Sequence, residues 1–330
     1  MVRSISVQTI IKQLGEGSSD PAVVIGDDFQ KYVMKTQRVF VDGKHQFYDS
    51  MFLNELLVYQ IAVYLGVPVP EATIAYLDRE IVQNDPRAVF AHRFFEGKHF
   101  ASEEISDLED NVIENYNQMA RMGKPYLRTS WKNFFRNVSN KNDIAKIVAM
   151  DILVGNYDRN SNTGNLLVTN EGFVRRIIAI DHGHAFQGPT WTPERANALT
   201  SVEVSEQYVQ GYARSFLVVN FNQGYLNGMG TVYNAIEEHI NVSDMVNHSF
   251  LEVVHKIEQI DENLVESWLE SVPDVWYVNK EYQKRLYKQY ILTHKVLVRY
   301  IIQDLLNRGA FSNSIGGVLK WKEKENAGTA

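Results

Sequence analysis

With 330 residues, of which 45% are hydrophobic and 22% charged, the chain has an ordinary globular composition and is long enough for one large domain or two lobes. The formal net charge of −7 argues against a broad nucleic-acid-binding surface. The absence of cysteine excludes disulfides, thiolate zinc sites and a cysteine nucleophile. No apolar run is long enough for a signal peptide or a membrane-spanning helix, so we expect a soluble, cytoplasmic protein that does not bind membranes.

The first hundred residues predict a β-rich lobe that contains one helix. Short β-branched or aromatic runs, separated by Gly, Asp and Pro, predict strands at residues 4–11, 22–27, 31–36, 72–78 and 88–95. Between them, residues 49–70 carry apolar side chains at helical spacing. Asp49 or Ser50 can cap the start of this helix, and Gly66 followed by Pro68 ends it.

The remainder of the chain predicts a mostly helical lobe. Helical patterns occupy residues 102–122, 142–155, 231–240, 243–260, 261–272 and 280–309. Ser243 and Asp261 stand where N-caps belong. The change of character follows the segment HRFFEGKHF, residues 92–100. We therefore predict an α+β fold with an N-lobe of residues 1–100 and a C-lobe of residues 101–330.

A glycine- and serine-rich stretch separates the first two predicted strands. Gly15 and Gly17 allow tight turns and a close approach to a ligand, and the backbone and hydroxyl groups of Ser18 and Ser19 can cradle phosphate oxygens. The alternative is a hairpin loop without a ligand. The stretch is therefore a candidate phosphate-binding loop.

Two charged residues of the N-lobe are compatible with the same ligand. Lys35 lies near the end of a predicted strand, and Glu55 lies on the predicted helix. In kinases a strand lysine contacts the nucleotide phosphates and a helix glutamate holds it by an ion pair. Each residue alone is more simply explained as a solvated side chain.

Two neighbouring segments in the middle of the chain carry aspartate and asparagine side chains. The stretch DILVGNYDRNSNTGNLLV, residues 151–168, contains Asp158 and Asn165, and Asp181 directly follows the apolar run at residues 177–180. A hairpin that pairs residues 166–168 with 177–180 and turns at TNEG would return Asp181 to the end at which Asn165 lies. The two segments are thus predicted to meet.

Oxygen ligands dominate this predicted meeting point. Asp158, Asn165 and Asp181 offer the hard oxygen atoms that Mg²⁺ prefers, together with an aspartate to orient a hydroxyl. The alternative is an Asn/Asp-rich loop that supplies turn and cap hydrogen bonds. His182 and His184 suggest zinc, but without a supporting His-Glu helix motif we favour hydrogen-bonding or packing roles for them. Arg159 is expected to brace the loop against a carboxylate, and Asp151 to be a buried acceptor.

The segments DILVGNYDRNSNTGNLLV and RIIAIDHGHAF resemble the catalytic and metal-binding segments of HipA-like kinases, bacterial relatives of the phosphatidylinositol-kinase-like branch of the protein kinase superfamily. NELLVYQIAVYLGVPVPEA is similar to part of that family's N-lobe, and the resemblance spans roughly residues 10–190. It implies a two-lobed protein-kinase-like fold that uses ATP and Mg²⁺. It also implies transfer of phosphate to Ser or Thr hydroxyls of a protein, and a regulatory protein partner. The alternatives are a kinase for small-molecule or lipid hydroxyls and a nucleotide-binding pseudokinase that acts as an interaction module.

The resemblance also implies individual roles. It makes Asp158 the catalytic aspartate, Asn165 and Asp181 metal ligands, Lys35 the phosphate-contacting lysine and Glu55 its partner. The glycine stretch would then bind phosphate, and its two serines are candidates for autophosphorylation.

One feature departs from the family's pattern. The metal-binding Asn of the family stands five residues after the Asp, where this chain has Thr163. Asn165 is seven residues after Asp158 and Asn162 is four residues after it. We favour Asn165, since it adjoins a strand that fixes its direction, and Asn162 is the alternative.

Overall fold

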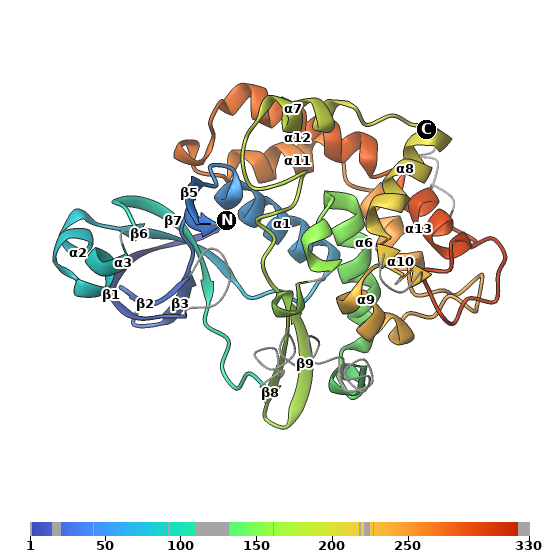
Figure 1. The fold of residues 1–330 in the computed structure, drawn as a ribbon, viewed down its shortest axis with the longest axis horizontal. Helices are drawn as coiled ribbons and strands as arrows, with labels where there is room; N and C mark the ends of the chain where they lie inside the picture. Colours follow the sequence, from blue (N-terminus) through green and yellow to red (C-terminus); the bar gives the residue numbers. More distant parts are fainter. Residues whose placement is uncertain are drawn as a thin grey trace, which may run out of the picture.

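The computed structural model describes residues 2–14, 21–41, 43–91, 93–109, 132–160, 162–217, 219–220, 225–226 and 228–322. It has a β-rich N-terminal region beside a helical C-terminal region, so the predicted α+β architecture is confirmed (Figure 1). The division into lobes at residue 100 stays a prediction, and strand β7 (Gly97–Glu103) passes through it.

The N-terminal region is a closed barrel in the order β1-β2-β3-β7-β6. Its other strands are β1 (Arg3–Gln13), β2 (Ala22–Gly26), β3 (Lys31–Met34) and β6 (Ala72–Leu77). Ile5 and Val7 of β1 point inward at alternate positions, and after a register shift between Val7 and Thr9 the next buried residue is Ile10. Strand β1 pairs parallel with β6, and all other pairs in the barrel are antiparallel.

Helix α1 (Met51–Leu65) connects the barrel to the helical region. Gly66 ends it in the left-handed conformation, with φ of +73°, and its N–H bonds back to Ala62 and Val63, as predicted. Ser50 is the N-cap residue, but its side chain makes no capping hydrogen bond. Buried side chains of α1 belong to one large core that also contains α6 (Ile144–Val154). That core holds the two regions together.

The described helical region packs around α6 (Figure 1). Its other helices are α7 (Pro193–Thr200), α8 (Glu206–Phe216), α9 (Thr231–Ile236), α10 (Leu251–Glu258), α11 (Glu262–Glu270), α12 (Lys280–His294) and α13 (Val298–Asn307). None of the helices in the described part of the chain combines the length and apolar character needed to span a bilayer.

A hairpin of β8 (Leu166–Glu171) and β9 (Val174–Ala179) projects from this helical body (Figure 1). The two strands are antiparallel and Leu166 pairs with Ala179, so the predicted hairpin is confirmed. The turn comes later than predicted, because pairing continues to Glu171 and the tip is formed by Gly172 and Phe173 with φ of +59° and +67°.

One strand predicted in the N-terminal region is wrong, and one hairpin there was not predicted. Residues 88–95 were predicted as a strand, but the short helix α3 (Pro86–Ala91) lies there. Asp85 accepts a hydrogen bond from the Arg87 N–H (2.8 Å), so an Asp-Pro helix start overrides the β-forming residues that follow. The strand in this part of the chain is β7, which pairs with both β6 and β3. The hairpin of β4 (Arg38–Val41) and β5 (Lys44–Phe47) was not predicted.

The other differences concern where helices begin and end. Residues 243–249 are not helical, because Asn241 and Asp244 accept hydrogen bonds from nearby backbone N–H groups and form turns. Asp261 does cap α11 by accepting from the Leu264 N–H (2.8 Å). The pattern at residues 280–309 is divided into α12 and α13. Of the helix predicted at residues 102–122, the first two residues end β7, and residues 110–122 lie outside the described residues.

Candidate active site

Three predicted site residues from three separate segments form one ionic cluster. Lys35 directly follows β3, Glu55 lies on α1 and Asp181 follows β9. The Lys35 Nζ lies 2.5 Å from Glu55 Oε1 and 2.9 Å from Asp181 Oδ1. The expected ion pair of Lys35 with Glu55 is therefore present, and Asp181 is a second partner of the same lysine.

Burial and charge act in opposite directions in this cluster. The side chains of Lys35 and Glu55 are 12% and 2% exposed, whereas that of Asp181 is 34% exposed. Burial alone would lower the pKa of Lys35, but the two carboxylates outweigh it and raise that pKa, so the lysine is charged. Burial would likewise raise the pKa of Asp181, but Lys35 outweighs it and lowers that pKa. Asp181, the more exposed of the two carboxylates, is therefore negatively charged and can accept a further cation.

Glu55 also fixes the segment that carries Asp181. Its two carboxylate oxygens each accept from the His182 N–H at 3.2 Å. Asp181 itself has φ of +60°, a left-handed conformation that costs a residue with a side chain about 1–2 kcal/mol. Gly183 approaches α1 so closely that a Cβ there would lie 2.5 Å from Met51 Cγ. The backbone of this segment is therefore pressed against α1.

The second group of predicted residues surrounds Asp158, in the 3₁₀ turn η2 (Tyr157–Asn160). Asn165 Nδ2 donates to Asp158 Oδ2 at 2.7 Å, and Asn162 Nδ2 lies 3.3 Å from the same oxygen. Asn165 is buried and its carbonyl oxygen accepts from the Ile180 N–H (3.1 Å), next to Asp181. The hairpin thus brings Asp158, Asn165 and Asp181 to one end.

The hydrogen bonds favour Asn165 over Asn162 as an oxygen ligand. Asn162 is exposed and its Oδ1 accepts from the Gly164 N–H (3.2 Å), so this oxygen already serves a local turn. Asn165 uses its nitrogen for Asp158, so its side-chain oxygen is the atom that could bind a cation.

Arg159 joins the segment around Asp158 to the segment around Asp181. Its side chain is fully buried, and Nε donates to Asp151 Oδ2 at 2.7 Å, which confirms both the expected brace and the buried acceptor. Its Nη1 donates to the backbone oxygens of Asn165 and Ile180, and Nη2 donates to His182 Nδ1 (3.1 Å). One guanidinium therefore ties the loop after Asp158 to the segment around Asp181.

The donor set fits a magnesium ion better than a zinc ion. One carboxylate and one amide oxygen, completed by water and phosphate oxygens, suit a hard cation. Within the described ranges no three His, Cys, Asp or Glu side chains form a metal-binding group. Burial and the adjacent Arg159 lower the pKa of His182, so it is neutral and accepts from Arg159, while the ring of His184 packs edge-on against Tyr48. The histidines have the packing and hydrogen-bonding roles expected.

For the predicted phosphate-binding loop, the structure describes only the residues on either side. Gly15, Gly17, Ser18 and Ser19 lie outside the described residues. Leu14 and Pro21, which flank these residues, are joined by a hydrogen bond from the Leu14 N–H to the Pro21 oxygen at 2.9 Å.

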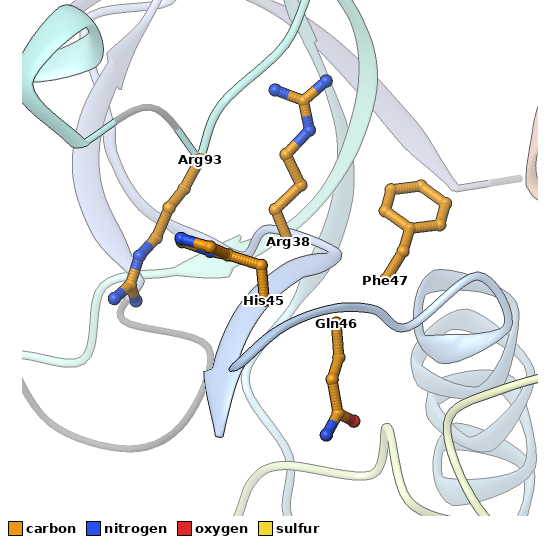
Figure 2. Close-up of a pocket in the computed structure, with 5 residues that line it drawn as sticks. All are labelled: Arg38, His45, Gln46, Phe47 and Arg93. Atoms are coloured by element: carbon orange, nitrogen blue, oxygen red, sulfur yellow. The ribbon is translucent and has the colours of Figure 1, made fainter. Parts of the chain in front are cut away.

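A hollow of about 420 Å³ lies elsewhere, along the β4–β5 hairpin (Figure 2). It is lined by Arg38, His45, Gln46, Phe47 and Arg93, and the two guanidinium groups extend in different directions. None of the predicted site residues lines it, so it is not part of the ionic cluster.

Sequence reasoning missed a buried polar group beside the cluster. Asn54, immediately before Glu55, is fully buried and bonds to the backbone after Asp181 and to Arg195 and Tyr287. The available signal was an amide next to Glu55 in a mostly apolar helix, because a buried amide demands hydrogen-bond partners.

Comparison with solved structures defines the class of the fold. CtkA, a proinflammatory kinase of Helicobacter pylori, superposes with a TM-score of 0.51 over 92% of this chain and 98% of that chain, at 15% identity. HipA of Shewanella oneidensis, solved with HipB and operator DNA, superposes with a TM-score of 0.43 over 87% of this chain and 65% of that chain, at 8% identity. A Golgi casein kinase with Mn and ADP bound superposes with a TM-score of 0.41 over 98% of this chain and 78% of that chain, at 12% identity. The fold is protein-kinase-like, as predicted.

The family model of the HipA-like kinases matches residues 7–199, which is more than half of the chain. The protein therefore belongs to the HipA-like kinase family and is a kinase-type phosphotransferase. No protein in the curated set matches the sequence.

Proposed function

We propose that this protein transfers the γ-phosphate of ATP, with Mg²⁺, to Ser or Thr hydroxyls of a protein. The observation that carries the proposal is the ionic cluster of Lys35, Glu55 and Asp181 beside the Asp158–Asn165 pair. These are the types of group that phosphoryl transfer requires, placed on segments far apart in sequence. We also propose the lobe boundary at residue 100 and a phosphate-binding role for Gly15, Gly17, Ser18 and Ser19.

The residues have distinct roles in this proposal. Lys35, held by Glu55, places the phosphates, and the Asp181 carboxylate with the Asn165 oxygen would hold the metal ion. When bound, Mg²⁺ supplies charge neutralisation on the phosphates. Asp158, oriented by Asn165, accepts the hydrogen bond of the acceptor hydroxyl and takes up its proton. The chain's contribution is mostly placement and electrostatics.

A protein hydroxyl is favoured as the acceptor over a membrane lipid. The chain carries a net charge of −7 and lacks a run of basic residues that would attract it to an anionic lipid surface. The resemblance to HipA-like kinases agrees with a protein acceptor.

One observation favours a second candidate, a pseudokinase that binds nucleotide without transfer. The Asp158-to-Asn165 spacing is two residues longer than the family's pattern. The 2.7 Å hydrogen bond between these side chains supports the catalytic proposal, because the longer loop still returns the amide to the aspartate.

Phosphate transfer from labelled ATP with Mg²⁺ tests the proposal, using protein, lipid-vesicle and small-alcohol acceptors in parallel. We expect labelling of the protein acceptor and its loss in Asp158→Ala and Asp181→Ala. Asp274→Ala, which removes a 76% exposed aspartate, is the matched control and should transfer normally. Unchanged transfer by the two site variants would refute the mechanism. Absence of transfer together with thermal stabilisation by Mg²⁺ and ADP would establish the pseudokinase instead.

A further inference from the structure

Asn54 contacts the loop that follows Asp181 through three of its backbone oxygens. The amide is fully buried, and Nδ2 lies 2.7 Å from the Gly183 oxygen, 2.9 Å from that of Ala185 and 3.1 Å from that of Gly188. An amide nitrogen has only two hydrogens, so at least one of them is shared between two carbonyl groups. Residues 183–188, here called the clamped loop, are thus tied to α1 at three points.

The opposite atom of the same amide is held by two other helices. Asn54 Oδ1 accepts from Arg195 Nη2 (2.9 Å), on α7, and from the Tyr287 hydroxyl (2.7 Å), on α12. Arg195 Nε also donates to the Phe186 oxygen in the clamped loop (2.8 Å). Because one side of the amide meets only carbonyl oxygens and the other meets donors, its orientation is fixed.

The neighbouring residue of α1 continues this set of contacts toward the ionic cluster. Glu55 accepts from the His182 N–H, and Asp181 directly precedes His182. Two successive side chains of α1 therefore hold the backbone from residue 182 to residue 188. The same glutamate is the partner of Lys35.

We propose that Asn54 is a positioning residue, which acts through the clamped loop to hold Asp181 where it can share a cation and nucleotide with Lys35. The proposal rests on the metal-binding role assigned to Asp181. Arg195 and Tyr287 take part by orienting the amide. Since small displacements of a ligand weaken binding and transfer strongly, loosening the clamped loop lowers metal–nucleotide affinity rather than stability alone.

Tyr287→Phe is the sharpest test, because it removes one hydroxyl from the network and keeps the ring. Its matched control is Tyr290→Phe on the same helix. Both rings pack against Phe186, but the Tyr290 hydroxyl contacts that of Tyr212 and not Asn54. Asn54→Leu removes all the hydrogen bonds of the amide at similar side-chain size. If Asn54→Leu does not fold, Tyr287→Phe still decides the test.

Two measurements are made on each variant. The first is the affinity for ADP with Mn²⁺, followed by the electron paramagnetic resonance signal of free Mn²⁺. Tyr287→Phe removes the hydroxyl that donates to Asn54 Oδ1 and accepts from Arg195 Nη2. We expect it to weaken the affinity about two- to tenfold, an effect the size of one net hydrogen bond, and Tyr290→Phe to leave it unchanged. The second is amide hydrogen exchange of residues 182–188 without nucleotide, which should be faster in Tyr287→Phe and Asn54→Leu than in Tyr290→Phe.

The outcomes separate this proposal from the proposed function. Exchange rates of residues 182–188 that match the control would overturn the clamp, whatever binds. Wild-type protein that binds Mn²⁺–ADP, with Tyr287→Phe binding equally well, would overturn the positioning role alone. Wild-type protein that does not bind Mn²⁺–ADP would overturn the proposed function, and the positioning role with it.

Discussion

Replacing Arg159 by methionine should destabilise the protein where the turn η2 (Tyr157–Asn160) meets the β8–β9 hairpin. The guanidinium is fully buried and bonds to the Asp151 carboxylate at 2.7 Å, to the Ile180 oxygen at 3.1 Å and to the Asn165 oxygen. Methionine replaces the aliphatic part of the arginine side chain but satisfies none of these acceptors. The substitution therefore leaves a buried carboxylate without a counter-charge.

The size of the effect follows from the partners that remain. Asp151 keeps the hydroxyl of Tyr233 (2.8 Å) and the amide of Asn156 (3.0 Å). Burial raises the pKa of Tyr233 well above its usual value, so the hydroxyl stays protonated and donates. Breaking a buried pair from one side costs about 3–5 kcal/mol. At about 1.4 °C per kcal/mol for a chain of this length, the melting temperature should fall by about 4–7 °C.

Urea unfolding followed by tryptophan fluorescence measures this loss. Arg308→Met is the control, because Arg308 pairs with Asp304 near the surface of α13 at 2.5 Å and its loss should cost less than about 1 kcal/mol. Adding Asp151→Asn to Arg159→Met should recover part of the stability, since the uncompensated charge is then removed. A loss no larger than that of the control, or no recovery in the double variant, would refute the reasoning.

Three further outcomes follow from single contacts. Gly183→Ala should lower the free energy of unfolding in urea by about 1–3 kcal/mol and weaken nucleotide binding, because the new Cβ would lie 2.5 Å from Met51 Cγ. The control is Gly211→Ala on helix α8, where a Cβ meets open space, and it should be neutral or stabilising. The bidentate bond from Arg175 lowers the pKa of Glu109. The stability that this ion pair contributes is therefore present above the usual Glu pKa and is lost as the pH falls. Wild type should therefore lose more stability than Glu109→Gln between about pH 5 and pH 3. Phe173→Gly should stabilise by about 0.5–1 kcal/mol, because this 97% exposed residue has φ of +67°; an unchanged unfolding midpoint would contradict the strain.

The sequence predicted the parts of the site that depend on local pattern and strand pairing. The apolar runs at residues 166–168 and 177–180, on either side of TNEG, predicted the hairpin, and antiparallel pairing then placed Asn165 and Asp181 at the same end. The apolar spacing of α1, with Gly66 after it, predicted the helix that carries Glu55. These signals lie within a few residues of one another.

What the sequence did not predict depends on contacts between distant segments. Asn54 meets Gly183 and Tyr287, which are 129 and 233 residues away along the chain, and no local pattern encodes such a meeting. The contact of Lys35 with Asp181 was not predicted for the same reason, because the two residues are 146 positions apart along the chain. The strand predicted over α3 was wrong because one Asp-Pro helix start outweighed a β-forming composition.

A crystal structure with ADP and Mn²⁺, in which anomalous scattering locates the metal, tests the central claim most directly. The account predicts Mn²⁺ bound by the Asp181 carboxylate and the Asn165 side-chain oxygen, with Lys35 directed at the phosphates and Asp158 beside the site of the missing γ-phosphate. Mn²⁺ bound through Asn162 would correct the ligand assignment. Nucleotide or metal bound away from Asp181 and Lys35 would contradict the account.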